Sequence, residues 1–287
     1  MTTRIRTSGD SRPTRPKSLT DSAPDAFVLT LWTNDPALAA RADAAGIDRV
    51  GVDVERLGKA DRQRGLGTWV STHTLDDLAG VGAAIARASL FARLNPLHDG
   101  SAAEVEAAIR LGARVLMLPM VATIADAARV VALTSGRARV VLLVETADAL
   151  EAVGRLAAVP GVDEIHVGLN DLALSLGLTS RWQVLAGDRL LDAARAVHAA
   201  GRRFGFGGIA AVHDDALPIP ADLVYAEYAR VGATAALVAR AFPLTGDLRL
   251  EVVRARERLA FWRTADPDAL AGAHAELARR AAALTTW

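Results

Sequence analysis

Two acidic residues in the middle of the chain follow strongly apolar segments. Glu145 comes directly after RVVLLV (139–144), and Asp171 comes just after EIHVGL (164–169). A carboxylate at the edge of a dry core stays ionised only beside a cation or several hydrogen-bond donors. Carboxylate oxygens are ligands that Mg²⁺ and Mn²⁺ prefer, so the pair predicts a site for one of these metals. The structural alternative is that Glu145 caps the next helix and Asp171 pairs with an arginine.

Other polar residues also stand where an apolar run ends. They are Asp53, Glu55, Arg93, Asn95 and Asn170. The guanidinium of Arg93 offers two parallel donors to a carboxylate or enolate oxygen of a 2-oxo acid, although a salt bridge at the same rim would use it equally well. His73 precedes a helical segment that begins near Leu75. It is the candidate for proton transfer, because histidine titrates near neutral pH; the alternative is that His73 and Thr74 only begin the helix.

Eight short apolar runs alternate with Ala-rich segments of helical period from Phe27 onward. The runs cover residues 27–32, 49–54, 89–94, 114–119, 139–144, 164–169, 203–208 and 235–240. They are continuously apolar, as parallel strands covered on both faces are. Eight such repeats predict a closed (β/α)8 barrel, and no Gly-rich phosphate loop follows the first run to favour a doubly wound sheet. In a barrel the ends of the strands meet at one opening, where we expect the polar residues to converge.

Composition divides the chain into three parts. Residues 1–25 are rich in Arg, Ser, Thr and Pro and predict a disordered tail, residues 26–246 the barrel, and residues 247–287 a helical C-terminal extension. Lys plus Arg and Asp plus Glu number 33 each, so the zero net charge predicts no nucleic-acid or membrane partner. No apolar run approaches the roughly 18 residues that span a bilayer, and no signal peptide is recognisable, which predicts a cytoplasmic protein. The lack of cysteine excludes a thiolate metal site.

The segment LLVETADALEAVGRLAAVPGVDEIHVGLNDLALSLG (142–177) resembles the metal-binding core of the HpcH/HpaI aldolase and citrate lyase β-subunit superfamily. In that superfamily a glutamate after one strand and a G-x-x-D-L-[SA]-x-x-x-G loop hold a divalent metal. The matching residues are Glu145, Gly168, Asp171, Leu172, Ala173 and Gly177. The resemblance implies a TIM barrel, Mg²⁺ or Mn²⁺ held by Glu145 and Asp171, and a homo-oligomer.

The resemblance also implies a substrate. LMLPMVATIADA (116–127) is similar to the strand and loop where family members bind a substrate carboxylate, partly through backbone amides. This implies substrate contacts at Pro119, with further contacts at Gly168 and Asn170. Arg93, in FARLNP, corresponds to the substrate-binding arginine of the family. The implied activity is that of an aldolase that acts through the enolate of pyruvate or a related 2-oxo acid, with an aldehyde as the second substrate.

The second predicted strand departs from the family pattern. Keto-acid aldolases of the family carry a histidine soon after an acidic residue, and Arg56 stands in that place here. Citrate lyase-like members carry D-x-E-D, of which Asp53 and Glu55 match the first two acids. The resemblance is therefore that of a divergent member between the two branches, and His73 is the replacement candidate for the missing histidine.

Two alternatives to this aldolase remain open at this stage. A citrate lyase-like acyl-CoA lyase would use the acids of the second strand to assist metal-bound waters. A barrel that has lost catalysis would serve as a binding or scaffold protein. A Schiff-base aldolase is disfavoured, because the two lysines, Lys17 and Lys59, do not lie at strand ends. The loop that contains Lys59, Arg62 and Arg64 either closes over an anionic substrate or is solvated surface charge.

Overall fold

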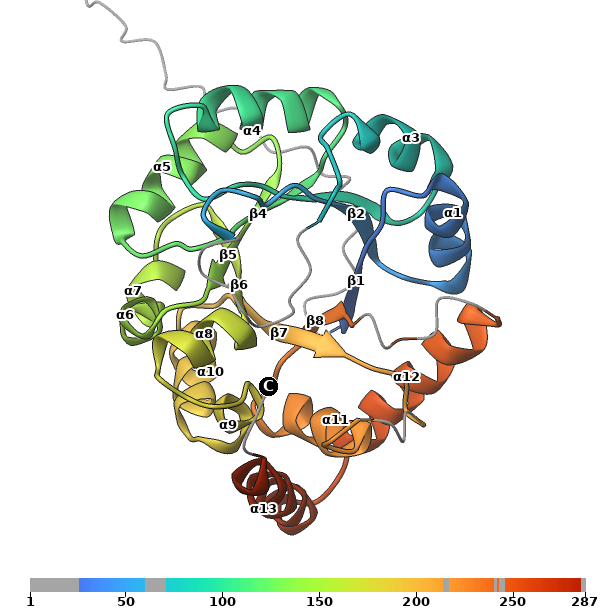
Figure 1. Ribbon diagram of the computed structural model, residues 1–287, viewed down its shortest axis with the longest axis vertical. Coiled ribbons are helices and arrows are strands. Elements are labelled where there is room, and N and C mark those ends of the chain that lie inside the picture. The colour runs from blue at the N-terminus through green and yellow to red at the C-terminus, as the bar shows by residue number, and fades with distance from the viewer. Residues whose placement is uncertain (1–25, 60–70, 214–216, 240–241, 243–245, 285–287) are drawn as a thin grey trace, which may run out of the picture.

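The chain forms a closed barrel of eight parallel strands surrounded by helices (Figure 1). This computed structural model describes residues 26–59, 71–213, 217–239, 242 and 246–284. The strands follow one another around the barrel in chain order, and β1 pairs with β8 to close it. The predicted (β/α)8 barrel with additional C-terminal helices is confirmed. The predicted tail at residues 1–25 lies outside the described residues.

Each of the eight predicted apolar runs overlaps one strand. The strands are β1 (Val28–Trp32), β2 (Arg49–Asp53), β3 (Ser89–Arg93), β4 (Val115–Leu118), β5 (Arg139–Val144), β6 (Val162–Val167), β7 (Arg203–Ile209) and β8 (Ala235–Val238). The helices are α1 (Pro36–Ala45), α3 (Asp77–Ala84), α4 (Ser101–Arg110), α5 (Ile124–Thr134), α6 (Ala147–Glu151), α7 (Val153–Ala157), α8 (Leu169–Ser175), α9 (Trp182–Ala186), α10 (Arg189–Ala199), α11 (Ala221–Arg230), α12 (Leu248–Arg263) and α13 (Pro267–Ala283).

Alternate residues of the strands face two different apolar layers. Residues such as Ala92 and Leu142 belong to the large cluster between strands and helices. A smaller cluster fills the barrel interior and consists of Phe91, Val115, Met117, Val141 and Leu143. Side chains two positions apart on a strand point to the same face. Arg93 therefore follows Phe91 into the interior, and Glu145 follows Leu143, so both reach the opening at the carboxyl ends of the strands.

The interior carries a buried ion pair near the start of the strands. Arg49 Nη2 lies 2.8 Å from Glu164 Oε2, and both side chains are almost wholly buried. Burial alone would raise the pKa of Glu164, but attraction to Arg49 and a contact with His166 lower it to about 2. Because Arg49 stands on β2 and Glu164 on β6, the pair connects strands that are not neighbours in the barrel.

The last two helices pack differently. After β8, α12 packs against α11 and α1, so the ring of helices closes with a helix that sequence analysis placed in the extension. The final helix, α13, packs outside this ring against α11 and α9. Glu227 of α11 is buried and binds Arg230 at 2.5 Å and His274 of α13 at 3.1 Å. The contact with His274 joins α13 to α11.

Candidate active site

The two predicted metal ligands lie together at the opening of the barrel. Glu145 directly follows β5 and is only 2 % exposed. Asp171 lies in the first turn of α8, which begins just after β6 and is capped by Gly168. The cap of α6 is Thr146, whose side chain accepts a hydrogen bond from the Ala149 amide. The capping role considered for Glu145 is therefore filled by its neighbour.

The surroundings of Glu145 disfavour a negative charge. Burial raises the pKa of this carboxyl well above its ordinary value, and the charges of Glu55 and Asp171 raise it further, while Arg93 acts in the opposite direction. Within the described part of the chain, Glu145 Oε1 is buried without a hydrogen-bond partner. A divalent cation beside Oε1 would satisfy this atom and offset the repulsion between the carboxylates. The residues present therefore fit the metal that the sequence predicts.

Gly168 allows the backbone to approach Glu145 closely. A Cβ atom at position 168 would stand 2.7 Å from Cγ and 3.0 Å from Cδ of Glu145. The φ angle of Gly168 is −89°, which other residues adopt readily. Glycine is therefore required at position 168 because any side chain would collide with Glu145. This reason is separate from the substrate contact that the resemblance implies for Gly168.

We expect Gly168→Ala to weaken Mg²⁺ binding about 10- to 100-fold, the usual cost of disturbing groups that support a metal ligand. The new methyl group would displace Glu145 and leave the barrel folded. Isothermal titration calorimetry measures the Mg²⁺ affinity, and circular dichroism shows whether the barrel is folded. Gly272→Ala is the matched control, because a Cβ atom at that position on α13 meets no other group within 4 Å. Unchanged Mg²⁺ affinity in Gly168→Ala would contradict this role of the glycine.

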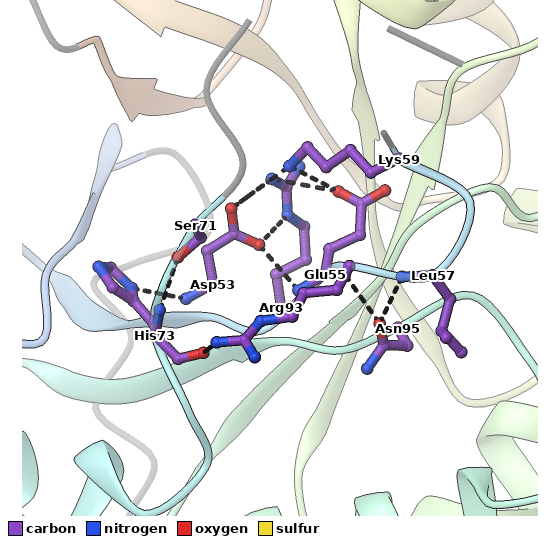
Figure 2. Close-up of polar contacts among 9 residues, drawn as sticks. Asp53, Glu55, Leu57, Lys59, Ser71, His73, Arg93 and Asn95 are labelled. Atoms are coloured by element: carbon purple, nitrogen blue, oxygen red, sulfur yellow. Dashed lines mark hydrogen bonds and ion pairs between the residues drawn. The ribbon is translucent and has the colours of Figure 1, made fainter. Parts of the chain in front are cut away.

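Arg93 is bound by a carboxylate of the neighbouring strand. Asp53 pairs with Arg93 in the register of β2 and β3, and Nε and Nη2 of the arginine donate to Oδ1 and Oδ2 of Asp53 at 2.7 Å each (Figure 2). Nη2 also lies 3.2 Å from Glu55 Oε2, and the guanidinium stacks 4.2 Å from the ring centroid of Trp32. The rim salt bridge considered for Arg93 is thus present. Substrate binding by Arg93 stays a prediction.

Lys59 joins the same cluster. Its Nζ lies 3.1 Å from Glu55 Oε2 and 3.5 Å from Asp53 Oδ2, and the residue is only 5 % exposed (Figure 2). In the sequence, Lys59 stands in a charged loop together with Arg62 and Arg64, which lie outside the described residues. The spacing of four residues from Glu55 was the available signal, because such a pair meets when the chain turns helically.

His73 supports the end of β2. Its Nδ1 accepts a hydrogen bond from the Asp53 amide at 3.1 Å, and its own amide donates to Ser71 Oγ at 3.1 Å. This arrangement assigns the ring proton to Nε2. Burial lowers the pKa of His73, so the ring is neutral at neutral pH. Arg56, in place of the family histidine, donates through Nη2 to the carbonyls of Thr72 and His73 at 2.9 Å each. Proton transfer by His73 stays a prediction.

The remaining candidates also follow strands. Pro119 is buried directly after β4, and Asn170 is half-buried in the first turn of α8, next to Asp171. Asn95, after β3, accepts hydrogen bonds from the amides of Arg56 and Leu57 at 2.9 and 3.1 Å. Asn95 therefore holds the loop after β2 in place. Substrate contacts at Pro119, Gly168 and Asn170 stay predictions.

Active sites of (β/α)8 barrels lie at the carboxyl ends of the strands, which is where the paired carboxylates stand in this barrel. The family model described as HpcH/HpaI aldolase/citrate lyase matches residues 27–222, and the chain therefore belongs to this family. The family predicted by resemblance is confirmed. No curated protein matches the sequence.

Solved structures share the fold. An HpcH/HpaI aldolase/citrate lyase family protein from Burkholderia cenocepacia J2315 is 21% identical with a TM-score of 0.60, over 84% of this chain and 96% of that one. An HpcH/HpaI aldolase from Desulfitobacterium hafniense DCB-2 is 17% identical with a TM-score of 0.58, over 85% and 95%. Protein CitE from Mycobacterium tuberculosis, in complex with magnesium and pyruvate, is 21% identical with a TM-score of 0.58, over 89% and 99%. At these identities the likeness shows the fold alone.

No helix in the described part of the chain has the length and apolar composition that a bilayer crossing requires. Assembly into a homo-oligomer and a cytoplasmic location stay predictions.

Proposed function

We propose that this protein is a divalent-metal-dependent carbon–carbon lyase, an aldolase acting through the enolate of pyruvate or a related 2-oxo acid. The charge balance of the opening carries this proposal. The charged groups are the carboxylates of Asp53, Glu55, Glu145 and Asp171 and the cations of Lys59 and Arg93. With all of them ionised, two negative charges remain in excess. One Mg²⁺ or Mn²⁺ ion would neutralise them.

Glu145 and Asp171 would hold the metal. Mg²⁺ commonly takes one or two protein carboxylates and completes its shell with water and substrate oxygens. Two protein ligands therefore suffice, although no group of three or more His, Asp or Glu side chains in the described residues is arranged to hold a metal. When bound, the metal supplies a Lewis acid for the keto oxygen of the substrate. The magnesium and pyruvate complex of CitE from Mycobacterium tuberculosis supports this choice of metal and substrate.

The protein groups around this pair have separate tasks. In the cleavage direction a 4-hydroxy-2-oxo acid passes its hydroxyl proton to a basic group at the opening, and its carbon–carbon bond breaks. The electron pair of that bond stays on the 2-oxo acid as an enolate while the aldehyde leaves, and the enolate carbon then takes a proton. The positive charge of Arg93, oriented by Asp53, stabilises the developing enolate. Backbone groups near Pro119, Gly168 and Asn170 bind the substrate carboxylate. The apolar barrel interior beneath them excludes water.

The geometry favours an aldolase over an acyl-CoA lyase. In the acyl-CoA lyase, Asp53 and Glu55 would assist metal-bound waters. Here Asp53 binds both nitrogens of one edge of Arg93, and Glu55 contacts Arg93 and Lys59. Both acids thus serve to place cations at the opening, which suits an anionic 2-oxo acid.

Deuterium exchange into the methyl group of pyruvate tests the proposal. In D2O with Mg²⁺, the wild type is expected to exchange the methyl protons, as followed by proton NMR, and EDTA should abolish the exchange. Asp171→Asn should lower the rate about 100-fold or more, because it removes a metal ligand. Asp192→Asn is the control, since Asp192 is an exposed acid on α10. Absence of exchange in the wild type would support the scaffold alternative and contradict the proposed function.

A further inference from the structure

Lysine is rare in this protein, and one of its lysines is buried at the candidate site. Of the 33 cationic residues only Lys17 and Lys59 are lysines, and the others are arginines. Lys59 is the one lysine within the described residues, and it is buried at the barrel opening. In a chain that uses arginine almost everywhere for positive charge, a lysine at this position calls for a property that arginine lacks.

The two cations of the cluster are held differently. Arg93 donates to both oxygens of Asp53 and stacks on Trp32, which fixes its guanidinium in one orientation. In the described part of the chain, Lys59 Nζ has two acceptors, Glu55 Oε2 and Asp53 Oδ2. An ammonium group carries three N–H donors. One donor of Lys59 therefore remains to reach an oxygen of a ligand that enters the opening.

Arg93 and Lys59 also differ in their acid–base chemistry. A guanidinium keeps its proton in proteins, whereas an amine gives up and regains one and is used in catalysis for that reason. Arg93 already supplies the fixed positive charge. Lys59, in contact with Glu55 and Asp53, adds a proton that can be transferred.

The other nitrogen groups near the opening have different tasks. His73 uses Nδ1 to accept from the Asp53 amide. Arg56 donates hydrogen bonds through Nη2 to two backbone carbonyls. Lys59 differs from both, because its Nζ contacts Glu55. The charge of Glu55 acts in turn on Glu145.

We propose that Lys59 is the proton-transfer residue at the end of the site where the carbonyl acceptor binds, an inference that rests on the proposed function. In the condensation direction the enolate carbon attacks the aldehyde carbon and the carbon–carbon bond forms. The aldehyde oxygen receives the electron pair of its π bond and takes a proton from the Lys59 ammonium, and solvent returns a proton to the amine. In cleavage the neutral amine accepts the hydroxyl proton. Lys59 thereby takes the task of the histidine that is missing from β2.

The experiment separates this step from formation of the enolate. Exchange of pyruvate methyl protons in D2O needs no acceptor, whereas product formation from pyruvate with glyoxylate, glycolaldehyde or propionaldehyde does. Lys59→Arg keeps the charge without a transferable proton. It should retain exchange within about threefold of the wild type and lose product formation about 100-fold or more, as loss of an acid–base residue does. Arg195→Gln, on the exposed face of α10, is the control.

Chemical rescue provides a second readout. The chain has no cysteine, so the thiol of a Lys59→Cys variant is the one thiol available for alkylation. Alkylation with 2-bromoethylamine converts the cysteine into a lysine analogue in which a sulfur atom replaces one methylene group. This should increase product formation at least tenfold over the unmodified variant. Alkylation with iodoacetamide should not.

The outcomes are distinct. Full product formation by Lys59→Arg, or equal loss of exchange and product, would overturn the proposal and leave Lys59 as a structural cation. A wild type that exchanges pyruvate but joins it to none of the three aldehydes would also overturn it, because the proposal requires a carbonyl acceptor. Absence of exchange in the wild type would instead contradict the proposed function.

Discussion

Glu145→Gln is expected to make the metal-free protein more stable and at the same time unable to gain stability from Mg²⁺. Burial raises the pKa of this carboxyl well above its ordinary value, and the neighbouring charges of Glu55 and Asp171 raise it further. A neutral amide of the same shape removes the repulsion, so we expect Glu145→Gln to have a higher free energy of unfolding than the wild type in EDTA.

Urea unfolding in EDTA and in excess Mg²⁺ measures both effects. A ligand that binds only the folded state raises its stability, so the wild type should gain stability from Mg²⁺ and the variant should not. Glu151→Gln, an exposed acid on α6, is the control and should behave as the wild type does. Lower stability of Glu145→Gln in EDTA, or an equal gain from Mg²⁺, would be incompatible with a metal at this carboxylate.

Glu164→Gln is expected to cause the largest loss of stability, about 3–5 kcal/mol at neutral pH, because it leaves Arg49 as an uncompensated charge inside the barrel. Replacing both partners, as Arg49→Met with Glu164→Leu, should recover most of the loss, since apolar residues of similar volume replace such pairs well. Urea unfolding of the single and double variants measures the difference. A loss below about 1 kcal/mol in the single variant would contradict an energetic role for the pair.

The same pair predicts a pH dependence. The pKa of Glu164 is about 2 in the folded protein, against an ordinary value of 4.5. A lowered pKa contributes stability that is present above the unfolded value and is lost as the pH falls through the folded value. The difference in free energy of unfolding between the wild type and Glu164→Gln should therefore be constant above pH 4.5 and should become smaller as the pH falls toward 2. A gap that stays constant over this range would contradict the assignment.

The barrel was predictable because its signals are local. Continuous apolar runs marked the strands, although several strand ends differ from the predicted ones by one or two residues. After β6, for example, Leu169 begins α8 instead of ending the strand. The eighth helix of the ring was less obvious. Its pattern from Leu248 onward is that of any amphipathic helix, and its place between α11 and α1 depends on contacts with distant segments.

The site was predictable only in part. Strand ends and a loop motif indicated Glu145 and Asp171, because position relative to a strand is local information. The partners of Arg93 depend on the register of β2 against β3, which places Asp53 opposite it. The neutral form of His73 and the burial of Lys59 depend on how the loop after β2 folds back, which composition does not encode.

Binding of Mn²⁺, followed by electron paramagnetic resonance, tests the metal site most directly, because free and bound Mn²⁺ give different signals. We expect one Mn²⁺ ion per chain in the wild type, displaced by Mg²⁺. In Asp171→Asn we expect Mn²⁺ binding to be weakened about 100-fold or more, since a carboxylate ligand is lost. Asp192→Asn should bind as the wild type does. A wild type that binds no Mn²⁺, or an Asp171→Asn variant that binds it unchanged, would contradict the metal site at Glu145 and Asp171.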